Sequence, residues 1–300
     1  MELGNKNLLY VDESFLDCYA PYTHNELQIL YRFFKQFQID KTLTVTLPFS
    51  IFQDMFHYET ENLIDVICRL LATVPTRPFF VGGFSDRRVV SLFKRGYMNR
   101  SKNTVTIEFS EDVMDFFQNF SSPAIINLAF IQNFVKYKDR YCDEIKLYEY
   151  LSWEYNQNSW ESWAYIPIDL KDLYFRCSTF EWFDKKYEDE YLKNSDILDM
   201  CVEITDEKGY RSKRYMWFIY SRSFISKDIE QINKWTDIFV DGYAPVRKGL
   251  QVTGVIFKVK RNDNCKDLQY IQGTLRDMSE EDQRFYTKCQ RLYEKNHRTR

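Results

Sequence analysis

The stretch that most constrains the fold is a helical pattern followed directly by two strand patterns, in residues 214–261. The apolar residues of its first part are spaced seven, four and three apart: Phe218, Ile225, Ile229 and Ile232. At 3.6 residues per turn, this spacing places them on one face of a helix. The opposite face carries Tyr220, Ser223, Lys227, Glu230 and Lys234, all of which except Glu230 are hydrogen-bond donors, with Arg222 and Ser226 at its flanks. An ordinary solvated helix has the same pattern, so the helix alone does not indicate a function.

A basic turn joins the two strand patterns. Residues 238–240 predict the first strand, and Val252, Val255, Phe257 and Val259 predict the second. Pro245 and Gly249 bracket a turn that holds Arg247 and Lys248, and the second strand ends in Lys258, Lys260 and Arg261. A helix beside a basic two-stranded ribbon is a common arrangement for gripping duplex DNA.

The charge distribution supports a polyanionic partner. The net charge of the whole chain is only −3. Residues 211–261, however, hold eleven Lys and Arg against four Asp and Glu, whereas the first 210 residues hold 22 against 33. A near-neutral total therefore hides one strongly basic segment, and such an asymmetry favours nucleic acid as the partner.

Composition argues against several other classes of protein. The seven cysteines are scattered and never form a CxxC pair, which predicts free thiols in a reducing cytoplasm. The three histidines are too few and too dispersed for most metal sites, and no cofactor is expected. The first residues resemble no signal peptide, and no apolar run is long enough to span a membrane. We therefore expect a cytoplasmic protein without a membrane segment.

The first half of the chain predicts a helix–strand–helix–helix order that ends in a hairpin. A capping box of Thr23 and Glu26 begins the first helix, which runs to about Gln38. The other expected elements are a strand at 43–47, helices at 50–56 and 59–73, a strand at 79–81, hairpin arms at 89–93 and 104–109, and helices at 111–119 and 123–135. Arg95, Arg100 and Lys102 are expected at the hairpin tip. This order is that of a winged helix.

The order then repeats. A helix is expected at 143–157, a strand at 163–168 and a short helix at 170–175, before the helix and strands of residues 214–261. An acidic segment, 178–210, interrupts this second copy. The prediction is an α+β protein with two tandem winged-helix domains, at residues 1–137 and 138–262. A tail at 263–300 carries a helix from Ser279.

These residues resemble the iteron-binding replication initiators of bacterial plasmids, the Rep proteins with two winged-helix domains. The similar motifs are Ile229–Asp237, Tyr243, Arg247–Gly249 and Val252–Phe257 near the end, Ile145–Leu151 at the start of the second domain, and Thr104–Phe109 with Glu111–Phe117 in the first. The order and spacing of the motifs, spread over residues 8–261, are more specific than any one of them. Two features depart from the family: Leu250 stands where an arginine is usual, and the family pattern has no segment like 178–210.

The resemblance implies a non-enzymatic protein that binds directly repeated duplex DNA at a plasmid origin. It further implies help in opening the origin, recruitment of the host initiator and helicase, and repression of the protein's own gene as a dimer in equilibrium with monomer. Phosphate contacts are expected from Arg211, Lys213, Arg214, Arg247, Lys248, Lys258 and Lys260, with Lys234 beside them and Arg95, Arg100 and Lys102 in the first domain. Base contacts are expected from Arg222, Ser223, Ser226 and Lys227.

Three other classes of function stay open at this point. A rolling-circle nickase would need a His-hydrophobe-His metal site, and no histidine has a partner two residues away. A winged-helix transcriptional regulator without a replication role would show the same pattern. A protein-interaction module could use the acidic segment 178–210, which could also cover the basic helix as a DNA mimic.

Overall fold

The computed structural model describes most of the chain. The described residues are 7–18, 22–56, 60–81, 88–134, 143–157, 163–177, 201–205, 211–215, 225–248 and 251–263. They fall into two compact units, residues 7–134 and residues 143–263. The predicted domain boundary at residue 137 and the predicted helix from Ser279 lie outside the described residues. Within the described part, no helix is both long and apolar enough to cross a membrane.

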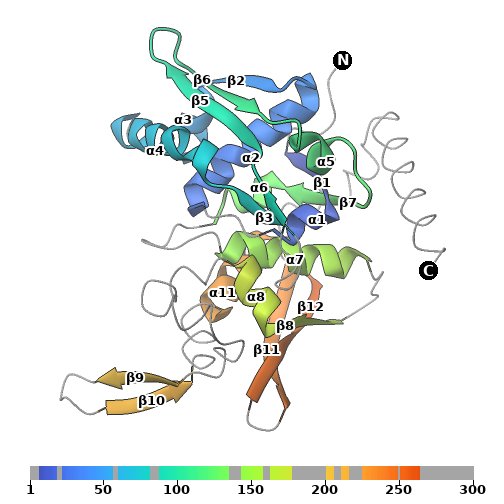
Figure 1. The fold of residues 1–300 in the computed structure, drawn as a ribbon. Coiled ribbons are helices and arrows are strands. Elements are labelled where there is room, and N and C mark those ends of the chain that lie inside the picture. Colours follow the sequence, from blue (N-terminus) through green and yellow to red (C-terminus); the bar gives the residue numbers. More distant parts are fainter. Residues whose placement is uncertain are drawn as a thin grey trace. The chain divides into compact units, whose positions relative to one another are not determined.

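The first unit mixes short strands with helices (Figure 1). In chain order its elements are β1 (Leu8–Asp12), α1 (Glu13–Leu16), α2 (His24–Asp40), β2 (Thr44–Pro48), α3 (Ser50–Phe56), α4 (Thr60–Thr73), the 3-10 helix η1 (Val74–Thr76), β3 (Phe79–Val81), β4 (Arg88–Val90), β5 (Phe93–Asn99), β6 (Thr104–Phe109), α5 (Val113–Phe117), β7 (Pro123–Asn127) and α6 (Leu128–Ile131). The largest sheet is antiparallel, with the order β2–β6–β5. Two smaller antiparallel sheets pair β1 with β7 and β3 with β4.

Helix α2 begins as the sequence predicts. The Thr23 side chain accepts a hydrogen bond from the Glu26 backbone N–H, and the Glu26 carboxylate accepts one from the Thr23 N–H at 2.9 Å. This reciprocal capping box satisfies two of the donors that a helix start leaves unpaired. The helix ends at Asp40 and is followed by the C-cap residue Lys41, whose φ of 54° is left-handed.

The core of the first unit is built from aromatic rings. Phe34 of α2 is fully buried and stacks on Phe117 of α5 at 4.1 Å between ring centroids, with 14° between the planes. It also contacts Phe93 of β5 and Phe109 of β6, at 5.7 and 5.6 Å. Phe34 therefore joins α2, α5 and the sheet through ring packing.

The hairpin prediction is correct for one arm and wrong for the other. The arm at 104–109 is β6, but its partner is β5, which begins at Phe93 and not at residue 89. Residues 88–90 instead form β4, which pairs with β3. Ser91 and Leu92 break the run because their carbonyl oxygens accept hydrogen bonds from the Ser110 hydroxyl and N–H, at 2.6 and 2.9 Å.

The predicted helix at 123–135 is also wrong. Residues 123–127 form strand β7, which pairs with β1. No helix or strand is predicted for residues 8–12, which form β1. Pro123 stands at the first strand position, where a missing N–H is tolerated. The Asn127 side chain then accepts from the Ala129 N–H at 3.0 Å and begins the short helix α6. The β-branched pair Ile125 and Ile126 suits the strand better than a helix.

The second unit carries α7 (Asp143–Gln157), β8 (Ala164–Asp169), α8 (Leu170–Arg176), β9 (Cys201–Thr205), β10 (Arg211–Tyr215), α11 (Ser226–Trp235), β11 (Ile238–Lys248) and β12 (Gln251–Arg261). Its main sheet is antiparallel with the order β11–β12–β8, and β9 and β10 form a separate antiparallel pair.

The two units share one order of elements. The series α2, β2, α3, α4, β5, β6 of the first unit corresponds to α7, β8, α8, α11, β11, β12 of the second. In both units the first strand of the series pairs with the last, and the last pairs with the one before it. The series differ by their insertions: η1, β3 and β4 lie between α4 and β5 in the first unit, and the pair β9–β10 lies between α8 and α11 in the second.

Two predicted boundaries in the second unit need correction. Tyr215, where the helix was expected to begin, is the last residue of strand β10, which pairs with β9; the described helix α11 spans Ser226–Trp235, and residues 216–224 lie outside the described residues. Pro245 does not open a turn but lies inside β11, opposite Val255. Strand β11 lies at the edge of its sheet, next to β12. Proline, which has no N–H, therefore removes no hydrogen bond to a second neighbouring strand.

Two glycines of the β11–β12 hairpin give a matched test of the packing. A Cβ on Gly254 would lie 2.8 Å from the backbone oxygen of Ile168 in β8, whereas a Cβ on Gly242 would meet nothing within 4 Å. We expect Gly254→Ala to lower the free energy of unfolding of the second unit by about 1–3 kcal/mol. Gly242→Ala should change it by no more than about 0.5 kcal/mol. Hydrogen exchange of β8 amides in the full chain measures both, and equal effects would contradict this packing.

Candidate nucleic-acid interface

Helix α11 presents one buried and one exposed face. Ile225, Asp228, Gln231 and Ile232 are buried, and Ser226, Lys227, Glu230 and Lys234 are exposed. The predicted phase of the helix is thus confirmed over residues 225–234, apart from the half-buried Ile229. The ammonium group of Lys234 lies 4.7 Å from the centroid of the Trp235 ring. The exposed face offers a hydroxyl and two ammonium groups, which are donors to base edges and phosphates.

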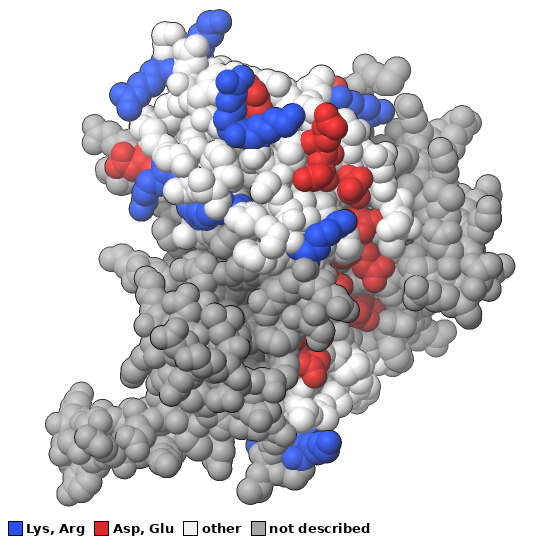
Figure 2. Space-filling model, in the orientation of Figure 1, with Lys and Arg blue, Asp and Glu red and all other residues white. Residues whose placement is uncertain are grey.

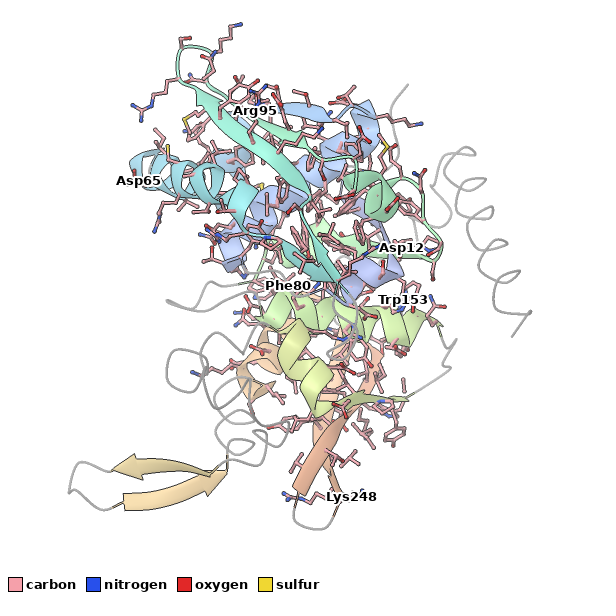
Figure 3. The ribbon with its side chains drawn as sticks, viewed as in Figure 1. Asp12, Asp65, Phe80, Arg95, Trp153 and Lys248 are labelled. Atoms are coloured by element: carbon pink, nitrogen blue, oxygen red, sulfur yellow. The ribbon has the colours of Figure 1, made fainter. Side chains whose placement is uncertain are left out.

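A second basic group lies at the free end of the β11–β12 hairpin. Arg247 and Lys248 are exposed and stand opposite Val252 and Gln251 in the register of the two strands. Figure 3 labels Lys248 at this end of the hairpin. Arg247 and Lys248 are the last two residues of strand β11 and not part of a loop, so the pairing with β12 fixes their backbone.

A third basic group lies on the outer face of the same sheet. In β12 the buried residues Val255, Phe257 and Val259 alternate with the half-exposed Lys258 and Lys260. Side chains alternate between the two faces of a strand, so both lysines lie on the face opposite to the core. The structure therefore does not place these lysines with the exposed residues of α11.

Trp163 and Asp241 fix the lysines of this outer face. The ammonium groups of Lys258 and Lys260 lie 4.2 and 5.0 Å from the Trp163 ring centroid. Lys258 also donates to Asp241 at 2.6 Å, and this bond raises the pKa of Lys258 above its ordinary value. The tryptophan contact has no local signal in the sequence, because Trp163 and the lysines are about 95 positions apart and are brought together by the pairing of β8 with β12.

The motif residues at the end of α11 have a structural role. Val240 donates its N–H to the Asn233 side-chain oxygen at 2.6 Å, and Asn233 donates its side-chain N–H to the Val240 carbonyl at 2.9 Å. The buried Thr236 hydroxyl donates to the Ile232 carbonyl at 2.9 Å. Asn262 donates to the carbonyls of Asn233 and Thr236, both at 2.9 Å. These bonds hold the end of α11 on the beginning of β11.

Two motifs that are far apart in the chain meet at Asp237. The hydroxyl of Tyr148, from α7, donates to the Asp237 carboxylate at 2.9 Å. Burial raises the pKa of the Asp237 carboxyl, and the hydrogen bond from Tyr148 opposes this effect. The contact ties the first helix of the second unit to the joint between α11 and β11.

The first unit places its basic residues differently from the prediction. Arg95 is not at the hairpin tip; it lies within β5 and forms an ion pair with Glu108 at 2.7 Å. Arg100 and Lys102 are exposed in the turn between β5 and β6, as predicted. Figure 2 shows Lys and Arg side chains projecting at the end of this hairpin.

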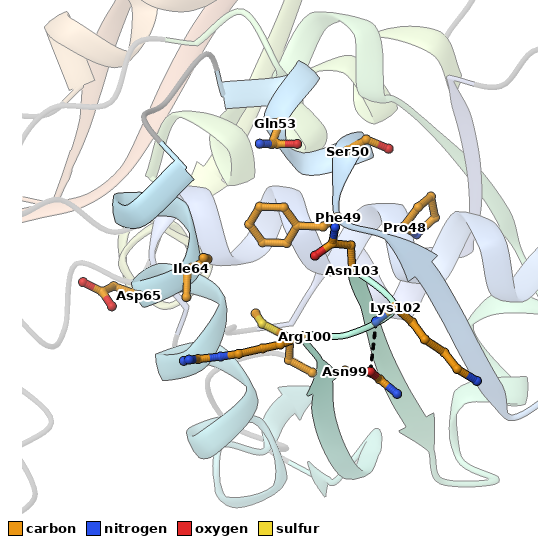
Figure 4. A pocket seen from close by; sticks show the side chains of 11 residues that line it. Pro48, Phe49, Ser50, Gln53, Ile64, Asp65, Asn99, Arg100, Lys102 and Asn103 are labelled. Atoms are coloured by element: carbon orange, nitrogen blue, oxygen red, sulfur yellow. Dashed lines mark hydrogen bonds between the residues drawn. The ribbon is translucent and has the colours of Figure 1, made fainter.

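A groove of about 750 Å³ lies beside this turn (Figure 4). Phe49, Ile64 and Met98 are among its apolar lining residues, and Arg100 and Lys102 line it from the turn. The turn is held by the Lys102 N–H, which donates to the Asn99 side chain at 3.1 Å. The groove therefore has a mixed polar and apolar lining, with two cations from the hairpin and the carboxylate of Asp65 from α4.

The structure describes only some of the other residues that were predicted to contact DNA. Arg211, Lys213 and Arg214 lie on β10, opposite Thr205, Glu203 and Val202 of β9. Arg222 and Ser223 lie outside the described residues, as do the apolar residue Phe218 and the segment 178–200. Among the described side chains, no group of three His, Cys, Asp or Glu residues is placed to hold a metal ion.

Comparisons with known proteins point to one family. Residues 13–152 match the family model described as initiator replication protein, WH1. A crystal structure of Pi initiator protein in complex with iteron DNA is similar to this chain, with a TM-score of 0.59 and 12% sequence identity. The similarity covers 87% of this chain and 100% of that chain, and at this identity it concerns the fold. No curated protein sequence matches. Over residues 13–152, slightly less than half of its length, the chain is thus similar to the family of initiator replication proteins.

Proposed function

We propose that this protein initiates plasmid replication by binding directly repeated duplex DNA with two tandem winged-helix domains. The observation that carries the proposal is the shared order of elements and strands in the two units. The family match of residues 13–152 and the similarity in fold to an initiator crystallised with iteron DNA support it. The protein acts by binding and not as an enzyme.

In this proposal, α11 enters the major groove of each repeat. Ser226 and Lys227 are the described candidates for base contacts, and the predicted Arg222 and Ser223 precede them in the chain. Arg247 and Lys248 contact the sugar–phosphate backbone from the hairpin end, and Lys234 does so from the helix. Arg211, Lys213 and Arg214 of β10 add basic charge from the inserted strand pair. Neutralising this many phosphates makes the affinity fall steeply with salt.

The first unit contributes backbone contacts from Arg100 and Lys102. Arg95 is a weaker candidate, because Glu108 already neutralises it. Lys258 and Lys260 contact a nucleic acid only outside the duplex that α11 reads, because they lie on the other face of the sheet.

The regulatory part of the proposal concerns assembly. Monomers bind the origin repeats, and dimers repress the promoter of the protein's own gene. The bound initiator opens the origin and recruits the host initiator and helicase. The acidic segment 178–210 is an insertion in the second winged helix.

Substitutions of two lysines are expected to distinguish base recognition from contact with the DNA backbone. Lys227→Ala should cost about 1–3 kcal/mol on the specific site and leave binding to shuffled duplex nearly unchanged. Lys248→Ala should weaken binding to both duplexes by the same factor and reduce the salt slope by about 1. Fluorescence anisotropy with the two duplexes at several salt concentrations measures both. A loss of specificity in Lys248→Ala alone would reverse these roles.

Two experiments test the proposed function: the selection of binding sites and the maintenance of a plasmid. The full-length protein would select binding sites from a randomised duplex library, and the DNA beside its gene would be searched for the selected sequence. We expect that sequence as direct repeats, and we expect a plasmid that carries the gene and the repeats to be maintained. A plasmid maintained equally well after the repeats are shuffled would refute the proposal.

A further inference from the structure

We infer that Tyr243 is a positioning residue for sequence-specific DNA binding, because its hydroxyl holds Ser226 at the first turn of α11. The inference rests on the proposed function and adds a residue on β11 to the recognition of the repeat. The two hydroxyl oxygens lie 3.1 Å apart and are hydrogen-bonded. This bond connects the hairpin to the helix end whose neighbouring residue, Lys227, is exposed for reading.

An irregularity in β11 turns Tyr243 towards the helix. Ile238 and Val240 are buried on the helix side of the strand, so regular alternation would place residue 242 on that side and 243 on the outer face. The register shifts between Val240 and Gly242, and Tyr243 then stands opposite the buried Phe257. A β-bulge commonly re-aims a side chain in this way.

Core packing fixes the direction of the Tyr243 ring. Its centroid lies 6.1 Å from that of Phe257, with 45° between the planes, and Phe257 is fully buried. The ring is thus anchored at one end while the hydroxyl reaches Ser226. A phenol held in this manner gives a hydrogen bond of fixed position at little cost in side-chain entropy.

The contact acts on the first described turn of α11. Ile225, the residue before Ser226, has helical backbone angles (φ −50°, ψ −45°), and its side chain makes no capping hydrogen bond. Ile225 therefore does not set the orientation of this turn. The hydrogen bond from Tyr243 supplies the orientation, and losing it should affect base reading more than contacts with phosphates, which Arg247 and Lys248 make from the hairpin end.

The test compares Tyr243→Phe with the wild type on two probes, the duplex selected from the randomised library and its shuffled counterpart. We expect the affinity ratio of selected to shuffled duplex to fall about fivefold, the loss typical of one hydrogen bond. Affinity for shuffled duplex and the melting temperature should not change, because the ring stays on Phe257. Ser226→Ala should produce a fall at least as large, because Ser226 is itself a candidate for a base contact, and the double variant should lose no more than Ser226→Ala alone.

Tyr165→Phe is the matched control. This tyrosine is 60% exposed on β8 and stands opposite Lys258, so it loses a hydroxyl on the outer face of the same sheet. Its affinity ratio should equal that of the wild type. The inference is overturned if Tyr243→Phe keeps the full ratio, if it loses affinity for both duplexes equally, or if the losses in the double variant add. If the wild-type protein selects no sequence at all, the proposed function itself fails, which is a different outcome.

Discussion

Replacing Phe34 by alanine is expected to lower the free energy of unfolding of the first unit by about 3–5 kcal/mol. Phe34 is fully buried and packs against rings from five other elements, with Phe117 stacked at 4.1 Å. Truncation removes this burial and leaves a cavity among side chains that are themselves fixed by ring contacts. Because neighbours such as Phe93 and Phe109 belong to the sheet, they have little freedom to collapse into the space.

Hydrogen exchange of α2 amides in the full chain measures this loss in the unit where it occurs. Tyr97→Ala is the control, since Tyr97 is 47% exposed on β5 of the same unit and loses a ring of similar size. That variant should change stability by no more than about 0.5 kcal/mol. Equal losses from the two substitutions would show that the ring cluster does not dominate the core.

The second large effect is expected from Arg77→Ala, at about 2–3 kcal/mol, because one partner of a mostly buried ion pair is removed. The guanidinium of Arg77 holds both oxygens of Glu26, at 2.9 and 3.0 Å, and also lies 5.2 Å from the Tyr22 ring centroid. The side chains of Arg77 and Glu26 are 26% and 8% exposed. Without Arg77, the Glu26 carboxylate would stay largely out of water with only the bonds of the capping box.

The pH dependence of this variant has a definite sign. Burial acts to raise the pKa of the Glu26 carboxyl, but hydrogen bonds from Arg77 and Thr23 outweigh burial and hold that pKa below its ordinary value of 4.5. The ionised carboxylate therefore stabilises the folded wild type above about pH 4.5, and this stability is lost as the pH falls through the lowered pKa. The difference between wild type and Arg77→Ala should be largest near neutral pH and should shrink below pH 4.5.

A double variant checks the origin of the effect. Glu26→Gln keeps the side-chain oxygen that caps α2 but removes the charge. Combining it with Arg77→Ala should cost less than Arg77→Ala alone, because no buried charge is then left without its partner. Urea unfolding at several pH values measures all the variants, and costs that add would contradict the account.

Local signals in the sequence predicted most helices of both units. The capping box of Thr23 and Glu26 and the helix α4, which ends just before Pro75, are visible within a few residues, and the structure confirms them. Strand β1 and strand β7 were missed because each depends on the other across more than a hundred residues. A pairing over such a distance leaves no periodicity in either segment, so an apolar run such as 123–127 resembles the start of a helix.

The candidate interface was likewise predicted only in part from the sequence. The exposed face of α11 follows from helical spacing, and the structure confirms it at Ser226, Lys227 and Lys234. The charge distribution along the sequence groups Lys258 and Lys260 with these residues, but the two lysines lie on the opposite face of the sheet. Spacing also could not show that Tyr243 turns inward, since the irregularity between Val240 and Gly242 reverses the alternation of the residues that follow it, as far as the second irregularity after Val246.

The central claim is that the two units together recognise a repeated duplex sequence. Its most direct test is a competition titration of the full-length protein at about 0.15 M salt, with selected and shuffled duplexes of equal length. The account predicts a preference of at least about a thousandfold for the selected duplex, and an affinity that falls steeply as salt is raised. Equal affinity for the two duplexes at this salt concentration would contradict it.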